Sequence, residues 1–118
     1  MTDIQIKRVY DKALSGDGVR ILVERLWPRG VTKAKAKIDM WLKDVAPSAE
    51  LRKWFGHDPV KWEEFKRRYW NELRHNQSAV ENLRACMKKG NATFVYAARD
   101  ETHNGALALR DYLTQNKF

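Results

Sequence analysis

The sequence predicts a single α/β domain with a small, largely parallel sheet flanked by helices. Apolar runs typical of strands are interleaved with segments of helical periodicity, and the last unit is strand, loop and helix. A length of 118 residues suits one compact domain over residues 1–118. No repeat or linker-like stretch divides the chain.

The first two elements are expected to be strands. Residues 4–10 alternate apolar and polar side chains, which indicates a strand with one buried face. A turn at residues 15–18 leads into residues 19–27, whose denser apolar content favours an interior strand. Pro28 cannot donate a ladder hydrogen bond, so we expect this strand to end at Trp27.

The next part of the chain predicts loops and one short helix. Residues 32–37 alternate lysine with alanine and favour a basic loop that admits one helical turn. Residues 39–45 are compatible with a short strand or a packed loop. Pro47 and Ser48 then favour the start of a short helix that closes at Gly56.

The longest expected helix begins at a strong start motif. Asp58 can accept hydrogen bonds from the first-turn amides, and Pro59 lies where its missing N–H costs nothing. Apolar side chains then recur at helical spacing over about four turns. This stripe comprises Trp62, Phe65, Tyr69 and Leu73.

The last third predicts a helix, a strand and a helix. Ser78 and Glu81 have the spacing of a capping box, and Gly90 is expected to stop that helix in a left-handed conformation. Residues 93–98 form a short apolar strand. The side chains expected to face inward from the two helices are Val80, Leu83, Met87, Ala106, Leu109 and Leu113.

Composition limits the classes of function. The net charge of +8 favours anionic partners. No signal peptide or membrane-spanning stretch is evident, so we expect a cytoplasmic protein without membrane contact. A single cysteine, Cys86, allows no intramolecular disulfide, and the histidines and glycines form no metal or nucleotide motif. Neither metal nor cofactor is therefore expected.

Two of the expected strands break into charged segments. We call residues 25–30 the first elbow and residues 99–105 the second elbow. Ligands of open α/β sheets bind at the carboxyl ends of strands, and arginine suits carboxylate and phosphate groups. Because parallel strands end at one edge, the elbows predict one shared pocket for a small anionic ligand. The expected ligand-binding residues are Arg25, Trp27, Arg29, Arg99 and Asn104.

Three residues are candidates for acid and base chemistry. His103 belongs to the second elbow, and His57 with Asp58 offers a base and an orienting carboxylate beside the pocket. If the pocket is catalytic, hydrolysis or group transfer on a small anionic metabolite is the expected reaction. Asp58 also suits the simpler role of a helix cap.

Structural roles compete with ligand binding at both elbows. Arg25 can form an ion pair with Glu24, Asp39 or Asp44, since an unpaired buried guanidinium is costly. In the second elbow, Asp100 can pair with Arg99 while Thr102 or Asn104 caps the last helix.

Two other functions are compatible with the sequence. A nucleic-acid module would use exposed tryptophan among basic residues, and a protein-interaction subunit would bury exposed tryptophan against a partner. The nucleic-acid candidates are Lys33, Lys35, Lys37, Lys66, Arg67, Arg68, Trp70 and Arg74. The oligomeric state and the identity of the ligand are not encoded in any recognisable motif.

Three long segments resemble the YeaO-like family of small bacterial proteins, a domain of unknown function. They run from Val23 to Gly30, from Leu51 to Pro59 and from Tyr96 to Asn104. The resemblance implies a cytoplasmic α/β domain and no established activity. In the wider group, the last strand commonly ends in a Cys-His-Arg-like turn, whereas this chain has Thr102-His103-Asn104, which removes any thiol nucleophile.

Overall fold

Four parallel strands form one sheet in the computed structural model, which describes residues 4–88 and 90–115. The strands are β1 (Ile4–Arg8), β2 (Val19–Leu22), β3 (Met40–Trp41) and β4 (Ala92–Tyr96). They lie in the order β1, β4, β2, β3, and every pairing is parallel. The predicted α/β class is confirmed. All four strands therefore end at the same edge of the sheet.

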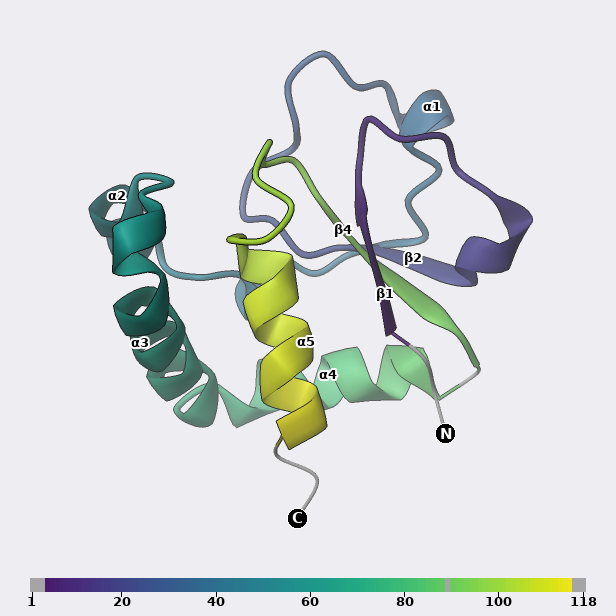
Figure 1. Ribbon diagram of the computed structural model, residues 1–118. Helices are drawn as coiled ribbons and strands as arrows, with labels where there is room; N and C mark the ends of the chain where they lie inside the picture. Colours follow the sequence, from purple (N-terminus) through teal and green to yellow (C-terminus); the bar gives the residue numbers. More distant parts are fainter. Residues whose placement is uncertain (1–3, 89, 116–118) are drawn as a thin grey trace.

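Helices and short turns connect the strands (Figure 1). The α-helices are α1 (Lys33–Ala36), α2 (Ala49–Phe55), α3 (Trp62–Arg74), α4 (Gln77–Met87) and α5 (Gly105–Gln115), and the 3₁₀ turns are η1 (Ser15–Asp17), η2 (Lys43–Val45) and η3 (Pro59–Lys61). Within these described residues, no helix is long and apolar enough to cross a membrane.

The two faces of the sheet are covered differently. On one face, Ile21 of β2 and Phe94 of β4 are fully buried in a core shared with α3, α4 and α5. On the other face, Leu22 and Val95 pack against Ala36 of α1 and the segment around it. The flanking helices predicted from the sequence thus lie mainly on one side.

β2 and β4 are shorter than the sequence predicts. β2 ends at Leu22 rather than Trp27, although the Val23 amide still donates to the Val95 carbonyl at 3.2 Å. Beyond it, the Glu24 carbonyl accepts from the Trp41 indole at 2.7 Å, so the backbone leaves the ladder. β4 likewise ends at Tyr96, two residues before the expected end, and β1 ends at Arg8.

Local capping motifs explain most helix boundaries. Ser48 caps α2, Gly56 ends it in a left-handed conformation, and Asp58 caps η3, which continues into α3. The capping box expected at Ser78 is wrong, because α4 begins at Gln77 and Asn76 donates its side-chain amide to the Asp44 carbonyl. Gly90 does not end α4, which already stops at Met87.

The buried side chains of the helices match the expected stripes. Phe65, Tyr69 and Leu73 of α3 are buried, while Trp62 is half-buried at the same face. The inward residues expected for α4 and α5 are all buried: Val80, Leu83, Met87, Ala106, Leu109 and Leu113. Helical periodicity alone was sufficient to find these faces.

A buried charge pair joins β2 to the segments on either side. Arg20 and Asp17 are 4% and 2% exposed, and their side chains meet at 2.6 Å. Arg20 Nη2 also donates to the Ala36 carbonyl at 2.8 Å. Burial alone would raise the pKa of Asp17, but hydrogen bonds from the Leu14 amide, Lys7 and Arg20 outweigh it and lower the pKa.

Replacing Arg20 with methionine should destabilise the protein strongly. The change removes the closer of the two cations that bind Asp17, leaving Lys7, and deprives the Ala36 carbonyl of its guanidinium donor; breaking a buried ion pair costs about 3 to 5 kcal/mol. Urea unfolding followed by circular dichroism measures the free energy of unfolding. Arg29→Met, at an exposed position, is the control and should stay within about 0.5 kcal/mol; equal losses in both variants would contradict the prediction.

Candidate functional site

A cavity of about 530 Å³ opens where β2 and β4 end. We call it the elbow pocket. Its wall consists of residues 24–26 after β2, residues 97–98 and 103–105 after β4, and residues of the segment 46–57 around α2, with Phe65 at the base. The two elbows therefore meet at one pocket, as the parallel strand ends predict. Its volume lies in the range of small-molecule sites.

Arg25 supports one wall of the elbow pocket. Its Nε donates to the Pro47 carbonyl at 3.2 Å, and its Nη2 donates to the Ala46 carbonyl at 3.1 Å. The ion pair expected with Glu24, Asp39 or Asp44 is not formed within the described residues. The guanidinium instead satisfies two carbonyls of the segment that leads into α2, so Arg25 both lines and shapes the pocket.

Trp27 and Arg29 lie outside the elbow pocket. The Trp27 indole donates to the Val31 carbonyl at 2.7 Å, and its ring packs edge-on against Trp41 on the opposite face of the sheet. Arg29 is exposed, and its carbonyl accepts from the Tyr10 hydroxyl. Because β2 ends at Leu22 and not at Trp27, the chain turns away between these positions, and the expectation that Trp27 lines the same pocket as Arg25 is wrong.

His103 is oriented by Asp100. Its Nδ1 lies 2.9 Å from Asp100 Oδ2 and 3.0 Å from the Thr102 hydroxyl, and its ring packs edge-on against Trp62. The Thr102 amide, together with the hydrogen bonds from His103, lowers the pKa of Asp100 to about 2. With Nδ1 engaged in this way, Nε2 is the ring nitrogen left for a ligand or a proton.

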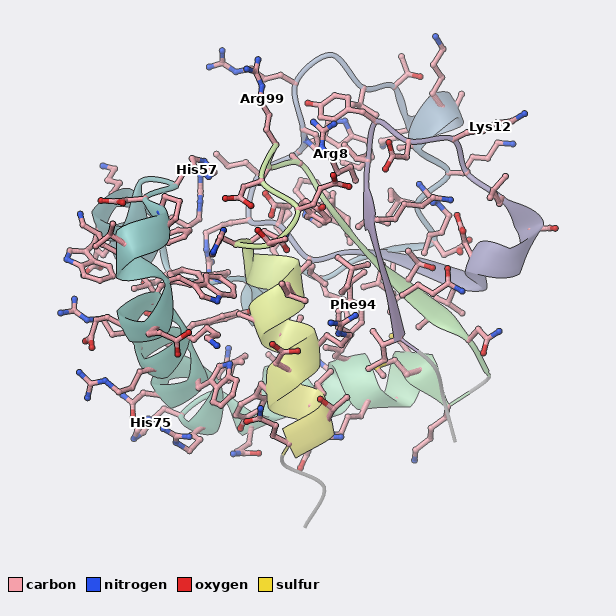
Figure 2. All side chains as sticks on the ribbon, in the orientation of Figure 1. Arg8, Lys12, His57, His75, Phe94 and Arg99 are labelled. Atoms are coloured by element: carbon pink, nitrogen blue, oxygen red, sulfur yellow. The ribbon has the colours of Figure 1, made fainter. Side chains whose placement is uncertain are left out.

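Arg99 does not take part in this arrangement. It is exposed and extends from the tip of the second elbow away from the sheet (Figure 2). No salt bridge joins Arg99 to Asp100 in the described part of the chain, so the expected pair is replaced by that of Asp100 and His103.

Asn104 lines the elbow pocket but its polar atoms are occupied. Its Oδ1 accepts from the Leu107 amide at 2.8 Å, and its Nδ2 donates to the Asp100 carbonyl at 3.0 Å. Of the two caps predicted for the last helix, the structure shows Asn104. The first amides of α5, at Gly105 and Ala106, have no intrahelical partner and add partial positive charge to this wall.

α2 adds cations that the sequence analysis did not include in the site. Arg52 and Lys53 line the elbow pocket and are exposed, and neither forms a salt bridge within the described residues. Ser48, the cap of α2, is bound by Glu72 of α3 through both its amide and its hydroxyl. This anchor holds α2 at the sheet edge, so only the tertiary structure reveals that Arg52 and Lys53 line the pocket.

His57 and Asp58 lie in different surroundings: only His57 lines the elbow pocket, whereas Asp58 caps η3. His57 follows Gly56 with a φ of +59°, is exposed and lines the elbow pocket beside α2 (Figure 2). Asp58 Oδ1 accepts from the Val60 amide at 3.1 Å and caps η3. No hydrogen bond joins the two side chains among those described, so the pair expected as a base and its orienting carboxylate is not formed.

Glu24 places a carboxylate among these cations. Its side chain is half-buried in the elbow pocket and forms no hydrogen bond with the described residues. Burial raises the pKa of Glu24, and the positive charge of Arg52 only partly opposes that effect. A carboxylate that lacks a full partner in a cavity is a candidate for contact with a ligand. The sequence predicts for Glu24 only a structural ion pair with Arg25.

No side chain that lines the described wall of the elbow pocket carries a thiol or a hydroxyl. Cys86 is half-buried on α4, and the Thr102 hydroxyl is engaged by Asp100 and His103. The described residues also include no group of three metal-ligating side chains. The pocket thus offers charges and hydrogen-bond donors, and no Ser, Thr or Cys nucleophile.

The basic residues considered for nucleic acid lie on two separate surfaces. Lys33, Lys35 and Lys37 belong to α1 and its end, on the face of the sheet opposite α3. On α3, Arg67 and Arg68 both bind Glu64. These charges do not form one continuous platform.

The tryptophans are also less available than the alternatives require. Trp70 donates its indole N–H to the Ala108 carbonyl at 3.0 Å and packs edge-on against Tyr112. All five tryptophans are half-buried. On α3, Lys66 lies near Glu63 and Trp62, while Arg74 is exposed. An exposed tryptophan, needed by both alternative functions, is not found.

The chain matches one protein family and several uncharacterized bacterial proteins. A family model described as the inactive DUF488-N3 subclade matches residues 3–117. The uncharacterized protein YeaO of Escherichia coli (strain K12) is 44% identical over 111 residues, which cover 94% of this chain and 96% of that protein. The uncharacterized protein Rv3073c of Mycobacterium tuberculosis (strain ATCC 25618 / H37Rv) is 39% identical over 112 residues, 95% and 94% of the two chains. The resemblance indicated by the three motifs is confirmed. No solved structure shows a significant match.

Replacing Glu24 with glutamine should stabilise the protein at neutral pH. The pKa of Glu24 is higher in the folded state, so the stability linked to its protonation is fully present below the unfolded value of 4.5 and is lost as the pH rises through the folded value. Glu24→Gln removes that loss. We expect a higher Tm than wild type at pH 7 and no difference at about pH 4.

Scanning calorimetry at the two pH values measures this effect. Glu81→Gln, an equal charge change at an exposed position on α4, is the control and should leave Tm unchanged at both. A Glu24→Gln protein that is less stable than wild type at pH 7 would show that the carboxylate is a structural partner.

Proposed function

The chain belongs to the inactive DUF488-N3 subclade, and from that premise we propose that it binds a small anionic metabolite of the cytoplasm in the elbow pocket without transforming it. The observation that carries the proposal is the pair Arg52 and Lys53. Both line a cavity of about 530 Å³ and are free of salt bridges among the described residues. Their charges are available to a ligand carboxylate or phosphate.

The surroundings of these cations favour an anion further. The first turn of α5 begins at Gly105 on the pocket wall, beside Pro47, and its free amides carry partial positive charge. Phe55 and Phe65 stack with a centroid distance of 4.3 Å and give the pocket an apolar side. An electrostatic interaction is stronger beside such low-dielectric walls than in open water. His103 can add a donor through Nε2.

Binding without turnover is favoured by what the wall lacks. Acyl and phosphoryl transfer through a covalent intermediate need a nucleophile such as serine, threonine or cysteine, and none lines the described part of the elbow pocket. The word inactive in the description of the family agrees with this argument. Arg25 fits a scaffolding role, because its guanidinium is bound to the Ala46 and Pro47 carbonyls.

Hydrolysis or group transfer is the second candidate, and the pair of His103 and Asp100 favours it. A carboxylate 2.9 Å from Nδ1 fixes the imidazole so that Nε2 can accept a proton from water. The nucleic-acid function is weaker, since its basic residues are divided between two faces of the sheet.

Anion binding should depend on α2 and not on the exposed arginines of the elbows. Inorganic phosphate and 3-phenylpropionate serve as probes. At ten times its Kd, a probe should stabilise wild type by about 1.4 kcal/mol. In a variant with Arg52→Met and Lys53→Met, both cationic contacts are gone, so we expect at least a roughly tenfold loss of affinity, since a charge-assisted hydrogen bond contributes about 1.5 to 3 kcal/mol.

The matched control is the variant with Arg29→Met and Arg99→Met, which changes the net charge equally outside the elbow pocket. It should bind both probes as wild type does. Thermal shift measurements with sodium chloride at equal ionic strength separate binding from general screening. Equal losses in the two double variants, or no shift with either probe at 10 mM in wild type, would refute the proposal.

Hydrolysis should be absent. We expect wild type to release no more 4-nitrophenol from 4-nitrophenyl phosphate or 4-nitrophenyl acetate than the His103→Ala variant does, because no side-chain nucleophile lines the described wall of the pocket. Absorbance at neutral pH measures the product. A rate that is at least tenfold higher in wild type would instead establish His103 as a catalytic base.

A further inference from the structure

The negative charge of Glu24 is unfavourable in a pocket that binds only anions. Glu24 is the one carboxylate on the described wall of the elbow pocket, in a wall that also presents Arg25, Arg52 and Lys53. A ligand with only negative charge would be repelled by it. The ligand must therefore carry a second group, other than an anion, that this carboxylate binds.

The structure holds Glu24 in place without neutralising it. Its carbonyl accepts from the Trp41 indole at 2.7 Å, which fixes the backbone at the end of β2. The neighbouring Arg25 is bound to the Ala46 and Pro47 carbonyls, and no salt bridge involves Glu24 within the described residues. The carboxylate is half-buried, so water compensates its charge only partly.

A ligand cation would complete this arrangement. A hydroxyl or amide donor would leave the negative charge of Glu24 in place, whereas a protonated amine supplies both a hydrogen bond and the opposite charge. Arg52 exerts a favourable field on Glu24 without contact and stays available for the ligand anion. The raised pKa of Glu24 agrees with a carboxylate that lacks a partner in the unliganded pocket.

The remaining wall favours an apolar body on that ligand. Phe55 and Phe65 are buried at the base of the elbow pocket, and Leu26 lines it with 64% of its surface exposed. An amphoteric molecule with an apolar side chain would place each of its three parts against a matching surface.

On the basis of the proposed function, we propose that the ligand class is α-amino acids with apolar side chains: Glu24 binds the ammonium group, Arg52 and Lys53 bind the carboxylate, and the phenylalanines contact the side chain. This assignment gives Glu24 a role in specificity, because it separates an amino acid from the corresponding acid without the amine.

Calorimetric titration with three probes that share a phenylethyl group tests the assignment. L-phenylalanine carries both charges, 3-phenylpropionate only the carboxylate, and 2-phenylethylamine only the amine. We expect wild type to bind L-phenylalanine at least about tenfold more tightly than 3-phenylpropionate, since the added contact is a charge-assisted hydrogen bond. The amine alone should bind more weakly still, because the arginine and lysine repel it.

Glu24→Gln should reduce this preference to about twofold or less by weakening L-phenylalanine alone, while 3-phenylpropionate binds as before or more tightly. Glu81→Gln is the matched control and should keep the wild-type preference. Equal affinities of the two carboxylates in wild type, or a preference that survives Glu24→Gln, would overturn the assignment. If 3-phenylpropionate or phosphate binds while the amine adds nothing, only this inference fails; if no probe binds, anion binding fails with it.

Discussion

Arg20 ties three parts of the fold to the central strand β2 through its guanidinium and its backbone amide. It reaches the turn η1 through Asp17 and the end of α1 through the Ala36 carbonyl, and the Arg20 amide is bound by Asp39 before β3. The two buried side chains stay together, because a buried charge without its partner would be prohibitively costly in free energy. β2 pairs in parallel with β4, so the chain after each strand emerges at the same edge. The elbow pocket exists because these two exits are adjacent.

Sequence reasoning succeeded where short-range chemistry decides the structure. The caps at Ser48 and Asp58 and the apolar stripe of α3 depend on neighbours within one or two helical turns. The convergence of the two elbows followed from the general geometry of parallel sheets. It failed where distant partners decide. The chain leaves β2 where the Glu24 carbonyl accepts from the Trp41 indole, and Arg25 then binds the Ala46 and Pro47 carbonyls, so distant partners set the end of the strand.

The residues of the candidate site also divide into those that the local sequence predicts and those that distant contacts place there. Arg25 and His103 were assigned to it because they follow strands, and both line the pocket. Arg52 and Lys53 were not assigned, because nothing local indicates that α2 lies across the strand ends. That position comes from Glu72 of α3, which binds both polar groups of Ser48. Trp27 lies outside the pocket for a related reason, since the strand predicted to reach it ends at Leu22.

The distribution of unsatisfied charge argues for binding at the elbow pocket. Elsewhere the chain pairs its polar groups closely, and among the described residues no buried side-chain nitrogen or oxygen lacks a partner. Asp17 and Asp100 both have lowered pKa values because several donors converge on them. Glu24 lies in a less compensated setting, and its pKa is raised. A fold selected for stability alone would pair or remove such a carboxylate, whereas binding sites retain charges that only a ligand completes.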